Sequence, residues 1–527
     1  MNDQSTKNKD AISSNGMAAT SHPLATEEAI KILKKGGNAV DAAIAASVVL
    51  SVVEPNATSI GGDCFAIIKM EGKEPVSYNG SGIAPKKANY EFFKKNNIDT
   101  IGLTSPHSVT VPGALDAWKN IHKDFGKLDF EELFLAAINF AKNGFEVTKI
   151  VSNTWNKNLN KLSQNKNSKN VFLNNGKSYQ LSDLRKNIPL GNTLELISKK
   201  GVSEFYEGSI ANDMVKSLNA LGGLHTLEDF SKQKTIKSET ISSEYKNIQI
   251  HQCPPNGPGI TVLLMMKLLE KLEINKFNSN SVERFHLEAE VTKQAYKVKE
   301  ENLADPNFVN VNLDKILSDE FIDNIYESIS LNKCSDIGDL NIPNHPETVY
   351  LSVVDKDLNT VSMINSVCYA FGSGITTDKT GIILHNRGTN FRVEEGHPNC
   401  IEGLKRPLHT IIPGVVLDHN GRTSLSYGVM GGQYQPVGQV HVLNNILDFE
   451  MSPQQAITFP RAFHFNNIYK LEKEVSKEIK DGLSKIGHNV VHVDDTHGGG
   501  QVIQIDRLKG NLIGGSDPRK DGYAKGY

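Results

Sequence analysis

ETVYLSVVD, the stretch from Glu347 to Asp355, joins two different kinds of sequence. The preceding residues 331–347 are polar and contain two prolines, a composition typical of an exposed linker. The run from Val349 to Val354 is rich in β-branched and aromatic residues, which predicts a β-strand. Thr348 therefore stands at the boundary between a linker and a strand.

A threonine at such a boundary can serve as a nucleophile if the chain is cut directly before it. Its own free α-amine then lies within reach of its hydroxyl and can take the hydroxyl proton. The pKa of a free α-amine is about 7.7–8.0, close enough to neutrality for this task. The hydroxyl of Thr348 can itself attack the carbonyl of Glu347, so the cut needs no second protein. Composition alone favours the alternative of an ordinary strand threonine.

Upstream of this junction the sequence predicts mostly helices. The stretch from Ala25 to Val53 is apolar and helix-forming, and Gly36-Gly37-Asn38 divides it into two helices. A short apolar strand is expected from Cys64 to Met70. Amphipathic helices alternate with loops through residues 106–308. Residues 1–21 are polar and are expected to be a disordered leader.

Downstream of the junction the sequence predicts strands separated by Gly, Asn and Asp turns. The expected strands after Val354 are Val361–Ile364, Gly381–Leu384, Ile411–Leu417 and Val502–Ile505. A helix-rich portion followed by a strand-rich portion indicates sheets covered by helices, an α+β fold.

The bulk properties exclude several classes of function. The 527 residues carry a formal net charge of -3, which gives no reason to expect a nucleic-acid or anionic-lipid partner. No segment approaches the roughly 20 apolar residues that cross a bilayer, so we expect a cytoplasmic protein. The five cysteines form no CxxC pair, and neither HEXXH nor a GxxxxGK[ST] loop occurs. We therefore expect no metal and no cofactor.

Several segments of the chain, in order, carry a resemblance to one known family. They are HPLATEEAIKILKKGGNAVDAAIAASVVLSVVEP (His22–Pro55), SIGGDCFAI (Ser59–Ile67), VTVPGALDAW (Val109–Trp118), PPNGPGITVLLMMKLLE (Pro254–Glu270), ADPNF (Ala304–Phe308) and SDPRKDGYAKGY (Ser516–Tyr527). Together they resemble the γ-glutamyltransferase family of N-terminal nucleophile hydrolases.

The resemblance places Thr348 at the family's processing threonine, with cleavage between Glu347 and Thr348. It implies a four-layer αββα sandwich built from a large portion, residues 22–347, and a small portion, residues 348–527. Because strands of both portions would share the sheets, the two fragments should stay together after cleavage. The resemblance does not decide whether copies of the chain form a homo-oligomer.

The resemblance also assigns roles to residues around Thr348. Gly431-Gly432, within YGVMGGQYQP, is similar to the family's oxyanion glycine pair, where backbone N–H groups meet the substrate. Ser366 falls at a hydroxyl position that orients the nucleophile. Thr410, within KRPLHTIIP, resembles a residue that holds the substrate carboxylate, and His409 beside it is either a substrate contact or a structural hydrogen-bonding group.

The sequence departs from the glutathione-type pattern at the substrate contacts. Ser81, within NGSGIAP, stands where such members have an arginine that grips a carboxylate, which is a non-conservative change. HNRGTNF puts Asn390 at the family's acidic position and adds Arg387 three residues earlier. These changes are more similar to the oxamate-amidohydrolase branch, although Ile83 stands where that branch often has an arginine.

Three hypotheses follow. The first is a self-processing amidohydrolase that cleaves a small amide bearing a carboxylate, either a γ-glutamyl compound or an oxamate-like acid, through an acyl-Thr348 ester. The second is a true transpeptidase or glutathione hydrolase, which needs an acceptor site that the sequence does not reveal. The third is an unprocessed, non-catalytic binding protein on the same fold.

Overall fold

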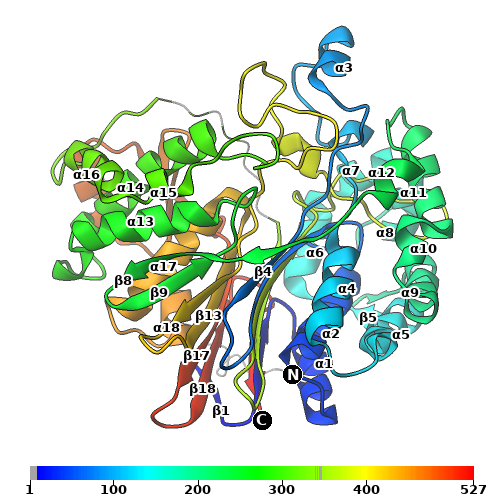
Figure 1. Cartoon of the computed structure of the whole chain (residues 1–527), viewed down its shortest axis with the longest axis horizontal. Helices are drawn as coiled ribbons and strands as arrows, with labels where there is room; N and C mark the ends of the chain where they lie inside the picture. Colours follow the sequence, from blue (N-terminus) through cyan, green and yellow to red (C-terminus); the bar gives the residue numbers. More distant parts are fainter. Residues whose placement is uncertain (1–8, 339, 341, 343–346) are drawn as a thin grey trace.

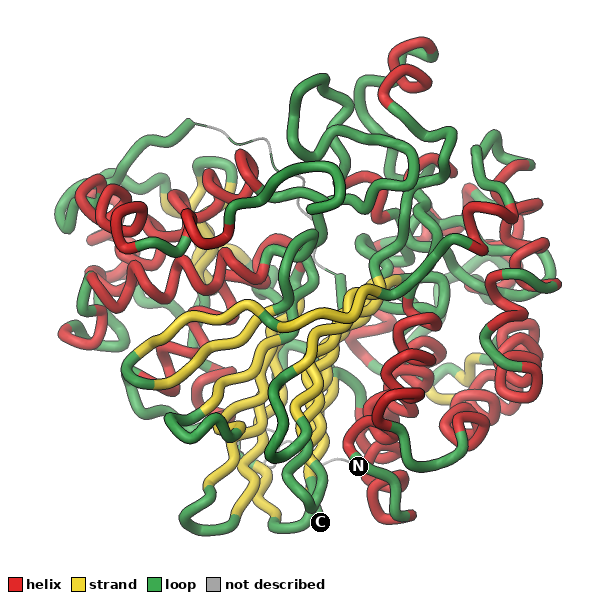
Figure 2. The backbone as a smooth tube through the Cα atoms, viewed as in Figure 1, coloured by secondary structure: helices red, strands yellow, loops and turns green. Residues whose placement is uncertain are grey.

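The computed structural model describes residues 9–338, 340, 342 and 347–527. Two seven-stranded sheets face each other, and helices cover the outer face of each sheet (Figure 1). The tube view shows the same arrangement, with the yellow strands enclosed between two groups of red helices (Figure 2). This confirms the predicted α+β class and the four-layer αββα sandwich.

The first sheet contains the junction at Thr348. Its strand order is β19-β2-β10-β11-β3-β4-β7, so the β10–β11 hairpin lies between β2 and β3. Strands from both sides of the junction therefore share this sheet. The bounds are β2 (Met17–Thr20), β3 (Asp63–Lys69), β4 (Val76–Gly80), β7 (Ile236–Glu239), β10 (Val349–Val354), β11 (Thr360–Ser366) and β19 (Tyr523–Gly526).

The second sheet is mixed in the same way, with the order β1-β18-β17-β13-β12-β9-β8. Its two ends come from the upstream portion and its centre from the downstream portion. The bounds are β1 (Ala11–Ser13), β8 (Ile241–Tyr245), β9 (Ile248–Gln252), β12 (Gly414–Leu417), β13 (Thr423–Met430), β17 (Gly499–Asp506) and β18 (Asn511–Ser516). In the described part of the chain, five short strands lie outside the two sheets. Strands β5 (Phe145–Glu146) and β6 (Leu184–Arg185) pair with each other, and β14 (Ala462–Phe465), β15 (Ile468–Glu472) and β16 (Val490–Val493) form a small sheet.

One helical layer covers each sheet. Over the first sheet lie α1 (Pro23–Lys35), α2 (Ala39–Val53), α4 (Ala114–Phe125) and α5 (Leu135–Asn143), with α6 (Lys149–Lys157), α7 (Leu159–Gln164), α8 (Lys166–Phe172), α9 (Ile188–Lys200), α10 (Ser203–Tyr206), α11 (Ser209–Asn219) and α12 (Leu227–Ser231) on the same side. Over the second lie α13 (Gly259–Lys271), α14 (Val282–Asn302), α16 (Asp319–Ser328), α17 (Gln435–Leu447) and α18 (Pro453–Thr458). Among the described residues, no helix combines the length and apolar character of a bilayer span.

Helix α2 shows why this sequence packs so tightly against the sheet. All of its residues are buried, and its small alanines allow close approach to the strands. Asn38 and Asp41 form a capping box at its start. The backbone N–H of Ala39 also donates to Asp355 Oδ2 at 3.0 Å, which ties the helix to the end of β10.

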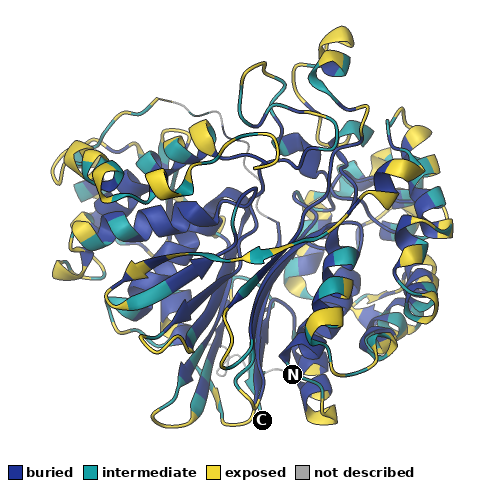
Figure 3. Cartoon of the chain, viewed as in Figure 1, coloured by how far each residue is buried: buried dark blue, intermediate teal, exposed yellow. Residues whose placement is uncertain are grey.

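The space between the two sheets is a buried core of its own (Figure 3). Phe65, Tyr350 and Ile364 belong to this core and are 0% exposed. Side-chain hydroxyls bridge the layers, since Ser352 Oγ lies 2.6 Å from Ser426 Oγ. These contacts fix the position of β10 against both sheets.

Some sequence predictions were wrong. Residues 11–13 and 17–20 form β1 and β2 rather than a disordered leader, because the small residues of β2 fit between β10 and β19 and pair with both. Residues 1–8 of that prediction lie outside the described residues. The run Gly381–Leu384 forms only isolated bridges, since its apolar side chains pack as a buried loop. Linker residues Ile342 and Glu347 are buried, at 4% and 8% exposed, instead of exposed.

Replacing Ile364 with alanine should leave a cavity between the sheets, because the side chain is 0% exposed. We expect the free energy of unfolding in urea to fall by about 2–5 kcal/mol. Leu508→Ala is the control, since Leu508 is 100% exposed and should change stability by less than about 0.5 kcal/mol. Equal unfolding midpoints for the two variants would contradict this account of the core.

Candidate active site

Thr348 lies directly before the first residue of β10 and is only 1% exposed. Its Oγ1 donates a hydrogen bond to the backbone oxygen of Glu347 at 2.5 Å. In the antiparallel pairing of β10 with β11, Val349 lies opposite Asn365, so Thr348 comes opposite Ser366. Ser366 Oγ is 3.2 Å from Thr348 Oγ1 and 3.3 Å from the oxygen of Glu347. The hairpin register thus brings both hydroxyls to the junction peptide.

The direction of the Ser366 proton follows from its other contacts. Ser366 Oγ accepts from the backbone N–H of Cys368 at 2.9 Å and from Arg387 Nη2 at 3.0 Å. A hydroxyl oxygen accepts two hydrogen bonds and donates one. The single Ser366 proton is therefore available to Thr348 Oγ1 or to the oxygen of Glu347.

The Gly431-Gly432 turn follows β13 and adopts a backbone that favours glycine. The φ angles are 128° at Gly431 and 58° at Gly432, and a Cβ at Gly431 would come 2.8 Å from Gly498 Cα. Both glycines are buried, and neither N–H donates to any other group in the described part of the chain. Gln435, at the start of α17, points its Nε2 toward Thr348 Oγ1 at 3.5 Å. The turn with these two unused backbone donors is thus followed directly by the residue, Gln435, that lies near Thr348.

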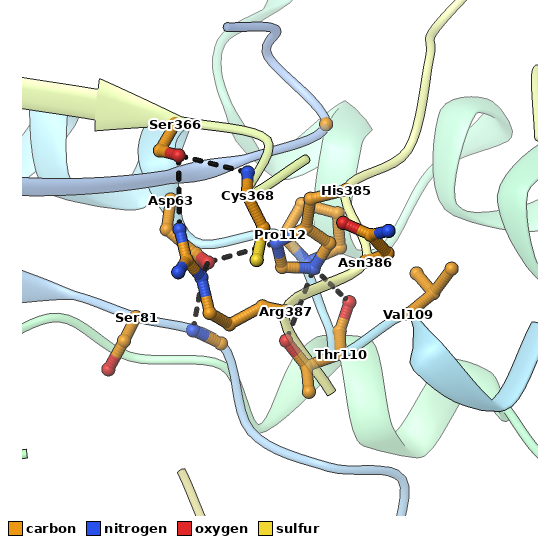
Figure 4. A network of polar contacts seen from close by, with 12 residues as sticks. Asp63, Ser81, Val109, Thr110, Pro112, Ser366, Cys368, His385, Asn386 and Arg387 are labelled. Carbon is orange, nitrogen blue, oxygen red and sulfur yellow. Dashed lines mark hydrogen bonds and ion pairs between the residues drawn. The ribbon is translucent and has the colours of Figure 1, made fainter. Parts of the chain in front are cut away.

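Arg387 lies between Ser366 and Asp63 (Figure 4). Its guanidinium is 0% exposed and donates from Nη1 to Thr410 Oγ1 at 3.0 Å. Nη2 bonds Ser366, and Nε lies 3.5 Å from Asp63 Oδ2. The two Nη atoms therefore meet neutral hydroxyls, while the Nε side meets the carboxylate.

Asp63, the first residue of β3, is the central acceptor of this network. Its Oδ2 lies 2.9 Å from His385 Nδ1 and 3.1 Å from His409 Nε2, and its Oδ1 accepts from the N–H of Gly82 at 3.0 Å. Burial alone would raise the pKa of Asp63, but the charge of His385 and the hydrogen bonds of His385 and His409 hold it well below its usual range. Burial, with the nearby Arg387 charge, lowers the pKa of His409 to about 3. His409 is therefore neutral near pH 7.

A pocket beside this network collects other predicted residues. Asn390, His409 and Thr410 line it together with Gln433. Lys299 Nζ holds Gln433 Oε1 at 2.7 Å, which fixes the turn after the two glycines. Within the described residues His409 Nδ1 has no hydrogen-bond partner. Ile342 of the linker also lines the pocket, so the uncut chain covers part of it.

Ser81 lies in the polar layer that supports the site and does not line this pocket. Its hydroxyl donates to Asn79 Oδ1 at 2.7 Å and accepts from Asn256 Nδ2 at 3.2 Å. Its carbonyl accepts from Arg406 Nε at 3.1 Å. The structure therefore places Ser81 among supporting hydrogen bonds next to Gly82, the residue that donates to the Asp63 carboxylate.

Sequence reasoning missed Asp63, His385, Cys368 and Gln435. One signal was available for Asp63, because an acid directly before the apolar run of β3 must be paired if it is buried. A signal was also available for His385, because it stands two residues before Arg387 in a segment that the sequence analysis had already singled out. No local pattern marked Cys368 or Gln435.

The chain is similar to known proteins over nearly its whole length. The family model for gamma-glutamyltranspeptidase matches residues 25–527. The glutathione hydrolase-like YwrD proenzyme of Bacillus subtilis is 34% identical, over 98% of this chain and 100% of that protein. The oxamate amidohydrolase proenzyme of Klebsiella pneumoniae is 27% identical, over 98% and 99%. The crystal structure of cephalosporin acylase from Bacillus halodurans is 31% identical with a TM-score of 0.91, covering 98% of this chain and 97% of that one.

Replacing Asp63 with asparagine should destabilise the fold by about 3–5 kcal/mol, because it leaves the buried Arg387 charge without its acidic partner. The pKa of Asp63 is held below its ordinary value of 3.8, so its contribution is complete above that pH. That contribution is lost as the pH falls toward the folded-state value. Urea unfolding should thus show a constant difference from about pH 7 to 5, shrinking below about pH 4.

Asp99→Asn is the matched control, since Asp99 is an acid whose side chain is 85% exposed. It should change stability by less than about 0.5 kcal/mol. A stability difference for Asp63→Asn that grows as the pH falls below about 4 would show the wrong sign and contradict the pairing.

Proposed function

The chain belongs to the gamma-glutamyltranspeptidase family, and from this premise we propose that it is a self-processing amidohydrolase with Thr348 as its nucleophile. The family's named members include hydrolases and transpeptidases, and several are proenzymes. The observation that carries the proposal is the contact between Thr348 Oγ1, Ser366 Oγ and the oxygen of Glu347.

Processing begins when Thr348 Oγ attacks the carbonyl carbon of Glu347. The C–O bond forms, the C–N bond of the junction peptide breaks, and the freed nitrogen takes the hydroxyl proton. Ser366 can donate its proton toward the carbonyl oxygen as negative charge develops there. Water then hydrolyses the ester, which leaves a carboxylate on Glu347 and a free α-amine on Thr348.

Catalysis reuses the same hydroxyl. The α-amine of Thr348 takes the Oγ proton while Oγ attacks the amide carbonyl of the substrate. The unused N–H groups of Gly431 and Gly432 are suited to the oxyanion, because they cost no reorganisation when charge appears. The amine of the substrate leaves with a proton, and water releases the acid from the acyl-Thr348 ester.

Arg387 supports a substrate whose carboxylate lies close to the scissile carbonyl. Its Nη2 is separated from the nucleophile by Ser366 alone, so it lies no farther than two hydrogen bonds from Thr348 Oγ1. A guanidinium binds a carboxylate in a charge-assisted, bidentate manner. An acid group on the carbon next to the carbonyl reaches this position directly, whereas a γ-glutamyl chain must fold back. We therefore favour an oxamate-like acid amide over a γ-glutamyl compound.

The Thr348→Ala chain should remain uncut, because no hydroxyl is left to attack Glu347. Thr348→Ser is the matched control, since it keeps the hydroxyl and should still be cut. Denaturing gels of fresh and aged protein check this: wild type should give fragments of 347 and 180 residues from its 527 residues. A wild-type chain that stays whole, or a Thr348→Ala chain cut at the same place, would refute self-processing.

Arg387→Gln should raise the KM for oxamate about 10- to 100-fold, since a hydrogen bond to a charged group contributes about 1.5–3 kcal/mol. Oxamide is the matched substrate, because it has an amide in place of the carboxylate and its KM should change little. Steady-state kinetics of processed protein with oxamate, oxamide, glutathione and a γ-glutamyl anilide will measure this.

An equal rise in KM for oxamate and oxamide in Arg387→Gln would show that Arg387 does not bind the substrate carboxylate. Turnover of the γ-glutamyl anilide with no turnover of oxamate would reverse the substrate preference. Product analysis with and without glycylglycine separates hydrolysis from transfer to an acceptor.

A further inference from the structure

A second buried cluster of chemically reactive side chains lies away from Thr348, in the helical layer that covers the second sheet. His286 and Glu290 stand one turn apart on α14, and His488 follows α19 (Lys477–Ile486). One nitrogen from each histidine and one oxygen of Glu290 all lie within 4.8 Å of one another. Three ligand-type atoms thus converge in a buried space that the proposed catalysis does not use.

The individual distances suit a small cation. His286 Nδ1 lies 2.7 Å from His488 Nε2, and His488 Nε2 lies 3.8 Å from Glu290 Oε1. A tetrahedral metal with bonds of about 2.0–2.3 Å holds its ligand atoms roughly 3–4 Å apart. The cluster needs only a small separation of the two imidazole rings to reach that spacing.

The hydrogen bonds of His286 already prepare it as a ligand. Its Nε2 lies 2.7 Å from the backbone oxygen of Ser330, which can only accept. The proton of neutral His286 is therefore on Nε2, and the lone pair on Nδ1 points into the cluster. A histidine ligand held by a backbone carbonyl through its other nitrogen is the usual supporting arrangement in metal sites.

Cys334 lies outside this group of three, on the other side of Lys293 from Glu290, and offers a fourth candidate ligand. Lys293 Nζ is 2.5 Å from Glu290 Oε1 and 3.2 Å from Cys334 Sγ. The Lys293 side chain is only 2% exposed, and the buried Glu290 carboxylate needs a positive partner. Lys293 supplies that positive charge. The Lys293 ammonium thus bridges Glu290 and Cys334, two groups that a metal ion could join in its place.

We propose that His286, Glu290, His488 and Cys334 form a binding site for a divalent transition metal of the zinc class. Two imidazoles, a carboxylate and a thiolate are the ligand types that zinc prefers. On binding, Cys334 releases its thiol proton to solvent water. His488 changes tautomer by exchange with water, so that its proton lies on the nitrogen that does not bind the metal, and Lys293 moves away from Glu290.

The position of the site suggests a structural role. His286 and Glu290 belong to the portion before Thr348, Cys334 to the start of the linker, and His488 to the portion after Thr348. A bound metal would therefore clamp the base of the linker to both portions. This consequence for the two fragments rests on the proposed cleavage, whereas metal binding itself does not.

Motif searching could not reveal this cluster. Only His286 and Glu290 are close in sequence, and His488 is 202 residues from His286. No CxxC or HEXXH pattern connects the ligands, because the fold alone brings them together. The sequence-based expectation of no metal rested on that missing pattern.

The test is a Co²⁺ titration of the full chain after chelator treatment, followed by visible absorption, with Zn²⁺ as competitor. We expect one equivalent bound per chain, with a thiolate-to-cobalt band that disappears in Cys334→Ser. Glu290→Gln and His488→Gln should weaken binding at least about tenfold. Lys293→Met should bind at least about tenfold more tightly, because the competing charge is gone.

His464→Gln is the matched control: its ring lies 6.3 Å from that of His488, outside the ligand set, and binding should be unchanged. Circular dichroism verifies that each variant is folded. The wild-type titration tests the proposal even if a variant fails to fold. The uncut Thr348→Ala chain is titrated in parallel, so a failure of cleavage cannot be mistaken for a failure of the metal site. Absence of saturable Co²⁺ binding to wild type, or full affinity in His488→Gln, would overturn the proposal.

Discussion

The pairing of β10 with β11 is the constraint on which the site depends. Because Val349 lies opposite Asn365, the preceding Thr348 meets Ser366, and both hydroxyls contact the oxygen of Glu347. A register shift of one residue would turn Thr348 to the other face of the sheet. The buried cores on both sides of β10 make such a shift costly.

The same pairing explains how a cut chain would remain one unit. β10 is bonded on one side to β2 and, through β11, to β3 on the other. Strands β2 and β3 both come from the portion before Thr348. Cleavage would thus remove one peptide bond from a sheet whose hydrogen bonds all persist, which preserves the position of the new terminus.

The buried charges around Arg387 support the proposed substrate class. Asp63 neutralises Arg387 from the Nε side and leaves both Nη atoms facing the hydroxyls of Ser366 and Thr410. A substrate carboxylate can replace those hydroxyls as acceptor, whereas an ammonium group would meet a like charge. The network therefore supports the proposal of an anionic amide substrate.

Parts of this account were predictable from sequence. The strand from Val349 to Val354 and the helix from Ala39 to Val53 were expected with the bounds that the structure has, since long apolar runs with clear end signals leave little choice. The resemblance placed Ser366, Arg387 and Thr410 around Thr348, and the structure brings these side chains into contact.

Other parts were not predictable. The four residues of β2 carry no periodic signal, and only their pairing with β10 and β19 makes them a strand. Gly381–Leu384 has the composition of a strand but lacks a partner along its length. Asp63 and His385 are separated by 322 residues, so their contact is a property of the fold alone.

Peptide mass mapping of wild-type protein quenched in acid during turnover tests the central claim most directly. The account predicts that the peptide beginning at Thr348 carries the acyl group of the substrate as an ester, which hydroxylamine removes. Finding the acyl group on another residue, or finding Thr348 still joined to Glu347 in protein that turns over substrate, would contradict it.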